Sequence, residues 1–268
     1  MFSVLYNQTW IRIDLGLFAE KLLGGCEIMY KNYVFDLYGT LADIHTDEGL
    51  PELWEGLAKK YSDESAKYSA GEIQKRYGEL VEDEKNFVRK AHPGYEHIDI
   101  RIENVFRRLY NEKGAAASEK LVLDTALFFR RASREYIRLY DGIAELLGEL
   151  QKYGKVYLLT NAQRSFTWDE LGTLGILDKF DGIVISSDEG CCKPDKAFYQ
   201  TIIDRYGLDP SETIMTGNDP DADIRGGKAA GFDTLYIHSN ISPEIDYDTG
   251  CTYFIPDGNT LRMRDFLI

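Results

Sequence analysis

Short apolar runs, each ended by polar or turn-forming residues, recur along the chain and indicate a parallel β-sheet. The first run, residues 32–36 (NYVFD), is followed at once by the turn residues Tyr38-Gly39-Thr40. Four later runs have the same character, at 155–162, 182–186, 213–219 and 234–238. Amphipathic helical patterns separate them, at 142–152, 196–206 and 224–230. Because strands that alternate with helices form right-handed βαβ units, we predict an α/β fold with a doubly wound parallel sheet.

Residues 50–138 show a different pattern, with apolar side chains at helical spacings and little strand-like alternation. The pattern is interrupted near Pro93 and again at Gly114, which predicts several separate helices. We therefore expect a helical insertion at 44–138 in an α/β core that consists of residues 29–43 and 139–268. The end of the chain is expected to complete the edge of the sheet.

The first 28 residues are expected to lie outside this core as an N-terminal extension. A secretory signal begins with a basic region, whereas the first basic residue here is Arg12. Met29 stands directly before the first strand and would itself serve as a start, so the extension is consistent with an upstream start site. The alternative is a short amphipathic helix that packs on the core.

The net charge of the chain excludes some classes of binding partner. Lys and Arg total 31 and Asp and Glu total 45, which gives a net charge of −14. A protein this acidic repels polyanions on average, so we expect no nucleic-acid partner and no anionic membrane partner. No apolar run approaches the roughly 18 residues of a membrane span. The four cysteines form no metal-binding or redox motif, which favours free thiols and a cytoplasmic location.

Four strand ends carry reactive side chains. They are Asp36, the pair Thr160-Asn161, Lys193, and an acidic cluster in GNDPDADIRGG (217–227). Each alone has a bland explanation as a cap, a turn or a surface charge. Together they supply a nucleophile, a hydroxyl donor for an anion, a cation that neutralises charge, and a cation site. Such a set suits phosphoryl transfer through a covalent aspartyl intermediate.

The chain resembles the haloacid dehalogenase-like hydrolase superfamily. FDLYGTL resembles the first motif of that superfamily, LLTNA the second, CCKPDKAFY the third, and TGNDPDADIRGGKAAGF the fourth, in the same order. The resemblance covers residues 31–240 and implies that the helical insertion is a cap over the active site. It further implies that Asp36 is the nucleophile, that Thr160 binds the transferring group, and that Lys193 neutralises charge.

The same resemblance implies a Mg²⁺ site, and further side chains near it are expected to contact substrate. Asp36 and Asp223 would bind Mg²⁺ with a third ligand that is either Asn218 or Asp219. The side chains expected to contact substrate are Tyr38, Thr40, Asn161 and His45.

Tyr38 departs from the phosphatase pattern, which has an Asp two residues after the nucleophile as the acid and base. Tyrosine has a pKa near 10 and is a poor base at neutral pH. Haloacid dehalogenases have Tyr at this position, and halide leaves without protonation. His45, on the connection to the helical insertion, is a candidate replacement acid, although a solvated linker histidine is the commoner case.

The fourth motif favours a phosphatase over a dehalogenase. It has three carboxylates within residues 219–223, which suit a cation site, whereas the dehalogenase form of this motif has few acidic residues. We therefore expect a Mg²⁺-dependent phosphatase that acts on a small phosphorylated metabolite. The alternatives are a 2-haloacid dehalogenase that uses the same Asp36, and a weakly catalytic protein that binds a phosphorylated ligand.

Overall fold

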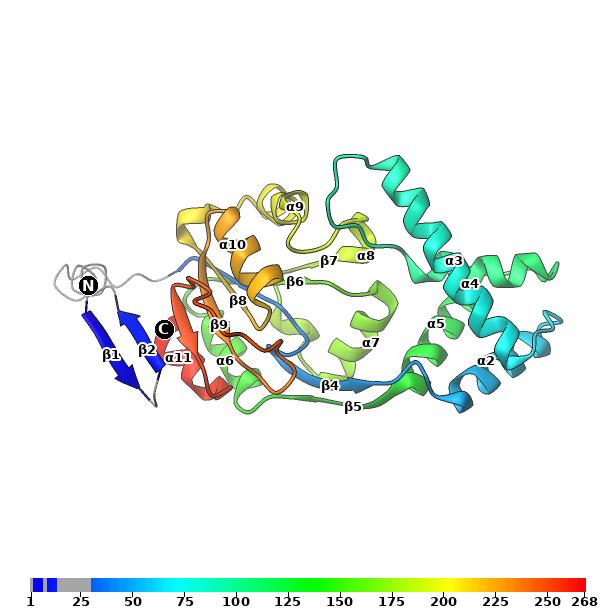
Figure 1. Cartoon of the computed structure of the whole chain (residues 1–268), viewed down its shortest axis with the longest axis horizontal. Helices are drawn as coiled ribbons and strands as arrows, with labels where there is room; N and C mark the ends of the chain where they lie inside the picture. The colour runs from blue at the N-terminus through cyan, green and yellow to red at the C-terminus, as the bar shows by residue number, and fades with distance from the viewer. Residues whose placement is uncertain (1, 7–8, 14–29) are drawn as a thin grey trace.

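The computed structural model describes residues 2–6, 9–13 and 30–268 (Figure 1). Near the N-terminus, β1 (Phe2–Tyr6) and β2 (Thr9–Ile13) pair with each other as an antiparallel hairpin. These two segments are strands, so they do not belong to the amphipathic helix considered above. Residues 1, 7–8 and 14–29 of the expected extension lie outside the described residues.

Six parallel strands form the central sheet, in the spatial order β10-β9-β8-β3-β6-β7. Their bounds are β3 (Asn32–Phe35), β6 (Lys155–Thr160), β7 (Gly182–Ile185), β8 (Thr213–Gly217), β9 (Asp233–Ile237) and β10 (Tyr253–Ile255). The chain adds β6 and β7 on one side of β3, then returns to add β8, β9 and β10 on the other. The predicted doubly wound parallel sheet is confirmed. Since the strand order reverses at β3, its carboxyl end is where such sheets place their sites.

Helices cover both faces of the sheet. Successive side chains of a strand point to opposite faces, so neighbouring residues of one strand pack against different helices. Tyr33 and Phe35 of β3 pack in one apolar cluster with α6 (Ile143–Leu150), whereas Val34 packs in another with α9 (Lys196–Tyr206). This double burial explains why the central strands are almost continuously apolar in sequence. The other α-helices of the core are α7 (Arg164–Leu174), α8 (Ser186–Glu189), α10 (Gly226–Ala229) and α11 (Arg264–Leu267). The core also contains the short 3-10 helices η1 (Leu177–Lys179), η2 (Pro210–Glu212) and η4 (Thr260–Met263), and the π-helix η3 (Pro220–Arg225).

The helices expected between residues 50 and 138 are present and have an apolar core of their own. They are α2 (Pro51–Asp63), α3 (Ala70–Ala91), α4 (Ile102–Glu112) and α5 (Glu119–Ser133). Phe129 contributes to this core by stacking on Tyr77 and by edge contact with Trp54. We call residues 51–133 the helical module, which projects from one side of the α/β core (Figure 1).

An antiparallel ribbon of β4 (Ala42–Thr46) and β5 (Arg134–Leu139) joins the helical module to the core (Figure 1). The sequence boundaries at 43/44 and 138/139 fall inside this ribbon, whose strands were not predicted. Asp43 ties the ribbon to the core, because its buried carboxylate accepts hydrogen bonds from Arg138 at 2.7 and 3.0 Å and from Asn240 at 3.0 Å. In the part of the chain that the structure describes, no helix is long and apolar enough to span a membrane.

Candidate active site

The carboxyl ends of β3, β6 and β8 bring the predicted reactive side chains to one edge of the sheet. Phe35 lies in register with Leu158 and with Thr216, so the residues that follow on the three strands are neighbours. The side chains gathered there are almost completely buried, and they are Asp36, Thr160, Lys193, Asn218 and Asp223. The structure therefore brings together, from four separate segments, side chains that the sequence predicts to form the site.

Lys193 joins the two carboxylates at the centre of the site. Its ammonium Nζ lies 2.7 Å from Asp36 Oδ1 and 2.7 Å from Asp223 Oδ1. Burial alone would lower the pKa of Lys193, but the charges of Asp223 and Asp36 hold that pKa above its ordinary value. Lys193 therefore stays protonated, and its positive charge lies directly against the Asp36 carboxylate.

Asp223 is the more deeply buried of the two carboxylates, at 1% exposure. Burial raises its pKa to about 7, against the opposing effect of Lys193. The backbone N–H of Asp219 donates to Asp223 Oδ2 at 2.9 Å, which fixes the orientation of the carboxylate. An added cation beside Asp223 would favour its ionised form.

Thr40 and Asn218 lie near the second carboxylate oxygen of Asp36. Thr40 Oγ1 is 3.2 Å from Asp36 Oδ2 and 3.3 Å from Asn218 Oδ1, so the two acceptor oxygens share one hydroxyl. Gly39 permits this approach, because a Cβ there would lie 2.3 Å from Asn218 Nδ2 and the φ of Gly39 is +86°. The carbonyl oxygen of Asn218 is thus turned toward Asp36.

Asp219, the alternative to Asn218 as metal ligand, has a different role in this structure. Its Oδ1 accepts hydrogen bonds from the backbone N–H groups of Asp221 and Ala222, both at 2.8 Å. This carboxylate therefore caps the start of η3.

Thr160 ends β6 beside the nucleophile and is fully buried. Its hydroxyl has no hydrogen-bond partner among the described residues. A buried hydroxyl without a partner is energetically costly, and an oxygen of a bound anion would satisfy it.

Asn161, predicted to contact substrate, is turned to the backbone of Lys193. Its side-chain amide donates to the Lys193 carbonyl at 2.9 Å and accepts from the Lys193 N–H at 2.8 Å. With both ends of the amide engaged, Asn161 holds the segment that carries Lys193.

The Tyr38 hydroxyl is engaged in a charged cluster that the sequence did not reveal. Its hydroxyl donates to the fully buried carboxylate of Glu170 on α7. Glu170 also accepts from Arg130 Nε at 2.7 Å and from Arg134 Nη1 at 2.9 Å, and the Arg130 guanidinium lies 5.5 Å from the centre of the Tyr38 ring. Burial, then the charge of Glu170, raise the pKa of Tyr38 far above its ordinary value. Tyr38 is therefore no base at neutral pH.

His45 lies on β4, away from the assembled site. Its ring stacks on Tyr136 across the ribbon, with the ring centres 6.1 Å apart, and its Nε2 is 3.8 Å from Glu135. The side chain is 57% exposed. These contacts match the solvated linker histidine better than a replacement acid.

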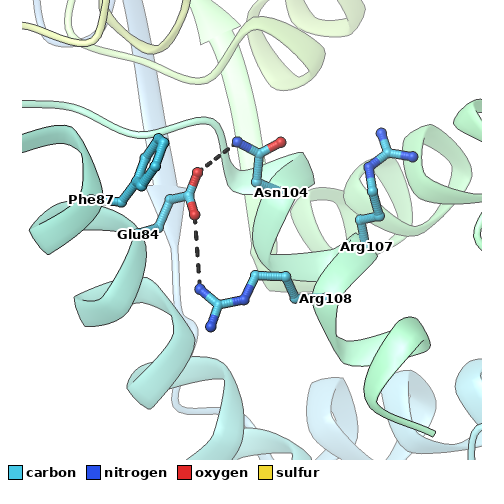
Figure 2. A pocket seen from close by; sticks show the side chains of 5 residues that line it. All are labelled: Glu84, Phe87, Asn104, Arg107 and Arg108. Carbon is cyan, nitrogen blue, oxygen red and sulfur yellow. Dashed lines mark hydrogen bonds and ion pairs between the residues drawn. The ribbon is translucent and has the colours of Figure 1, made fainter. Parts of the chain in front are cut away.

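A hollow of about 270 Å³ lies between α3 and α4 of the helical module (Figure 2). Glu84 at its wall accepts a hydrogen bond from Asn104 at 2.6 Å and lies 3.9 Å from Arg108. Phe87 and Arg107 complete the wall. The polar groups of Glu84 are thus already paired, and none of the catalytic residues lines this hollow.

Similarity to known proteins agrees with this geometry. A family model described as haloacid dehalogenase-like hydrolase matches residues 30–231. The HAD-hydrolase YfnB of Bacillus subtilis is 25% identical over 81% of this chain and 87% of its own length. Glyceraldehyde 3-phosphate phosphatase of Methanopyrus kandleri is 27% identical over 79% of this chain and 82% of its own.

Two solved structures share the fold. That of 2-haloacid dehalogenase from Pseudomonas syringae has a TM-score of 0.62 and 21% identity, covering 89% of this chain and 98% of the other. A magnesium-bound structure of YfnB has a TM-score of 0.51 and 22% identity, covering 89% and 99%. Because the family model matches residues 30–231, which is most of this chain, the chain belongs to the haloacid dehalogenase-like hydrolases.

Proposed function

We propose that this hydrolase is a phosphatase for a small phosphorylated metabolite and that it works through an aspartyl phosphate on Asp36. The observation that carries the proposal is the pairing of two features at one sheet edge. The Asp36 carboxylate is held 2.7 Å from the buried Lys193 ammonium. The neighbouring strand ends in the hydroxyl of Thr160, which has no hydrogen-bond partner within residues 2–6, 9–13 and 30–268. A nucleophile beside a cation and an open donor suits attack on a phosphoryl group.

The proposed reaction has two displacements at phosphorus. A carboxylate oxygen of Asp36 attacks the phosphorus atom, and the bond from phosphorus to the leaving oxygen breaks with its electron pair. The leaving oxygen takes a proton from solvent. Water then attacks the same phosphorus and the bond from phosphorus to the Asp36 oxygen breaks, which releases inorganic phosphate with the protons of that water and returns the Asp36 carboxylate. Throughout, Lys193 stabilises the negative charge near Asp36, and the Thr160 hydroxyl donates to a phosphoryl oxygen.

Mg²⁺ fits the oxygen donors present. Among the described residues no three His, Cys, Asp or Glu side chains form a ready metal cluster, so two carboxylates need a neutral oxygen as partner. Asp36, Asp223 and the carbonyl oxygen of Asn218 supply such a set, and the Tyr38 backbone carbonyl is a further candidate; Mg²⁺ prefers oxygen ligands. Asp219 fits less well because it caps η3. When bound, Mg²⁺ would supply a positive charge that stabilises the phosphoryl oxygens.

We propose that the helical module is the cap that covers this site. The catalytic side chains are nearly all buried, which implies that the module and core separate to admit substrate. The magnesium-bound structure of YfnB reveals interdomain movement in that relative, which is consistent with such a motion here. Glyceraldehyde 3-phosphate phosphatase of Methanopyrus kandleri, as a relative, supports a small phosphorylated substrate.

Dehalogenation is the second candidate, and Tyr38 is the observation that favours it. No acid stands in that position, and a halide leaving group needs none. The same Asp36 would then attack a carbon atom. A weakly catalytic protein that only binds a phosphorylated ligand is the third.

Release of phosphate and of halide should be measured on panels of phosphorylated metabolites and 2-haloacids, with and without Mg²⁺. We expect Mg²⁺-dependent phosphate release that Asp36→Asn abolishes. Asp209→Asn is the matched control, because Asp209 only caps the exposed turn at Ser211. Halide release without Mg²⁺ would establish the dehalogenase instead, and ligand binding without turnover would establish the third candidate.

A further inference from the structure

The loop between α3 and α4 of the helical module docks on the segment that carries Lys193. We call residues 96–102 the docking segment. Ile98 forms an antiparallel bridge with Cys191, the N–H of Cys192 donates to the His97 carbonyl at 2.9 Å, and the N–H of Asp99 donates to the Gly190 carbonyl at 3.1 Å. The docking segment thus pairs, as a short added strand, with the residues immediately before the catalytic lysine.

Asp195, two residues after Lys193, connects the docking segment to the core through one buried carboxylate. Its Oδ2 accepts the backbone N–H groups of Glu96 at 2.6 Å and His97 at 3.0 Å. Its Oδ1 accepts the N–H of Ala197 at 2.8 Å and so caps α9. The same side chain therefore fixes the helix that follows Lys193 and the loop that comes from the helical module.

Gln163 holds the other end of the docking segment, three residues after Thr160. Its Oε1 accepts the N–H of Ile102 at 2.9 Å, and its Nε2 donates to Asp99 Oδ1 at 3.3 Å. Asp99 Oδ2 also accepts the hydroxyl of Ser186 at 2.5 Å. The docking segment thus bridges the segments that carry Thr160 and Lys193.

The backbone around Lys193 consequently has two supports. Asn161 holds it from the core, with hydrogen bonds of 2.8 and 2.9 Å, and the docking segment holds it from the helical module. Because catalytic groups are effective only within narrow limits of position, removal of one support would displace the ammonium from Asp36. We infer that docking of residues 96–102 places Lys193 for catalysis, with Asp195 and Gln163 as the positioning residues that couple the helical module to the nucleophile.

Asp195→Asn tests the inference with little change in shape. Asn remains a good helix cap, but its amide cannot accept the hydrogen bonds of Glu96, His97 and Ala197 together. Hydrogen exchange at single amides is the first measurement. We expect exchange at Glu96 and His97 to quicken by about tenfold or more, since they lose a charged acceptor. The decisive amide is that of Lys193, which is bound by Asn161 and not by the docking segment. It should quicken as well.

Kinetics form the second measurement, and this arm rests on the proposed function. We expect kcat of Asp195→Asn to fall about 10- to 100-fold, with KM changed by less than about threefold, because the charge at Asp36 is disturbed rather than the substrate contacts. Gln163→Ala breaks the other end without touching the α9 cap and should give the same pattern. The double variant should lose less than the two single losses combined. Asp209→Asn, a cap with no contact to the helical module, should change neither measurement.

The outcomes separate the two proposals. If exchange quickens at Glu96 and His97 while the Lys193 amide stays protected, the docking segment is only a local contact and the inference is wrong. Unchanged kcat in both variants, with the wild type active on phosphates, would also overturn it. If the wild type releases no phosphate, the proposed function fails, and exchange at Lys193 still decides the inference. Should Asp195→Asn not fold, Gln163→Ala carries the test, with exchange at Ile102, whose acceptor it removes, in place of exchange at Glu96 and His97.

Discussion

Replacing Tyr38 by Phe removes a hydroxyl at the position where a proton donor would be needed. In the structure this hydroxyl donates to Glu170, which keeps Arg130 and Arg134 as partners at 2.7 and 2.9 Å after the change. A hydrogen bond to a charged group contributes about 1.5–3 kcal/mol, so the free energy of unfolding should fall by about that much. Since the Tyr38 hydroxyl is committed to Glu170, kcat/KM should stay within about threefold of the wild type.

The assay compares phosphorylated substrates whose leaving groups differ in their need for protonation. An acyl or aryl phosphate has a good leaving group, whereas an alkyl phosphate leaves slowly unless it is protonated. Without an acid beside Asp36, the wild type should favour the good leaving group by roughly 10²–10⁴-fold over an alkyl phosphate, and Tyr38→Phe should leave that ratio unchanged.

A matched control is Tyr61→Phe in the helical module, whose hydroxyl donates to a neutral carbonyl, that of Phe106, at 2.8 Å. It should cost only about 0.5–1.5 kcal/mol of stability. The reasoning is refuted if Tyr38→Phe loses activity on alkyl phosphates by 10²-fold or more while aryl activity survives, because Tyr38 would then be the acid.

Three further changes test other parts of the account. Thr160→Val removes a buried hydroxyl that has no partner among the described residues, so urea unfolding should show equal or greater stability while kcat/KM falls about tenfold or more. Asp219→Asn should leave the Mg²⁺ concentration for half-maximal activity nearly unchanged, whereas Asp223→Asn should raise it strongly; equal effects would make Asp219 a ligand. Although burial raises it, hydrogen bonds from Asn240 and Arg138 hold the pKa of Asp43 below its ordinary value. Its stabilising effect should therefore be present above pH ~4 and disappear as the pH falls further, and Asp43→Asn should remove that part of the acid dependence of unfolding.

The strand ends were predictable because apolar runs and the residues that terminate them are local features of the sequence. In a parallel sheet the carboxyl ends meet at one edge, so Asp36 and Thr160 could be placed together before any contact was known. Lys193 was also predicted at a strand end, but it follows the short helix α8 beyond β7 and reaches Asp36 from that loop. The helices of the module followed from their spacing in the same way. Asn218 and Asp219 remained alternatives in sequence, because adjacent residues share one strand end and only the hydrogen bonds of η3 distinguish them.

Other features depend on contacts between distant residues and have no local signature. Tyr38 and Glu170 are 132 positions apart, and Asp195 meets Glu96 at a separation of 99. The resemblance of LLTNA to the second family motif implied a substrate contact for Asn161, whereas in the structure the backbone of Lys193 takes both ends of its amide. The ribbon that carries His45 was missed because its two short strands are joined only after the whole helical module.

The central claim, that Asp36 becomes phosphorylated, is tested most directly by mass analysis of the protein quenched in acid during turnover. With Mg²⁺ and an acyl phosphate, we predict one phosphoryl group on the peptide that contains Asp36. That group should be absent from Asp36→Asn and present in Asp209→Asn. A phosphoryl group on a different residue, or turnover of phosphate by Asp36→Asn at the wild-type rate, would contradict the account.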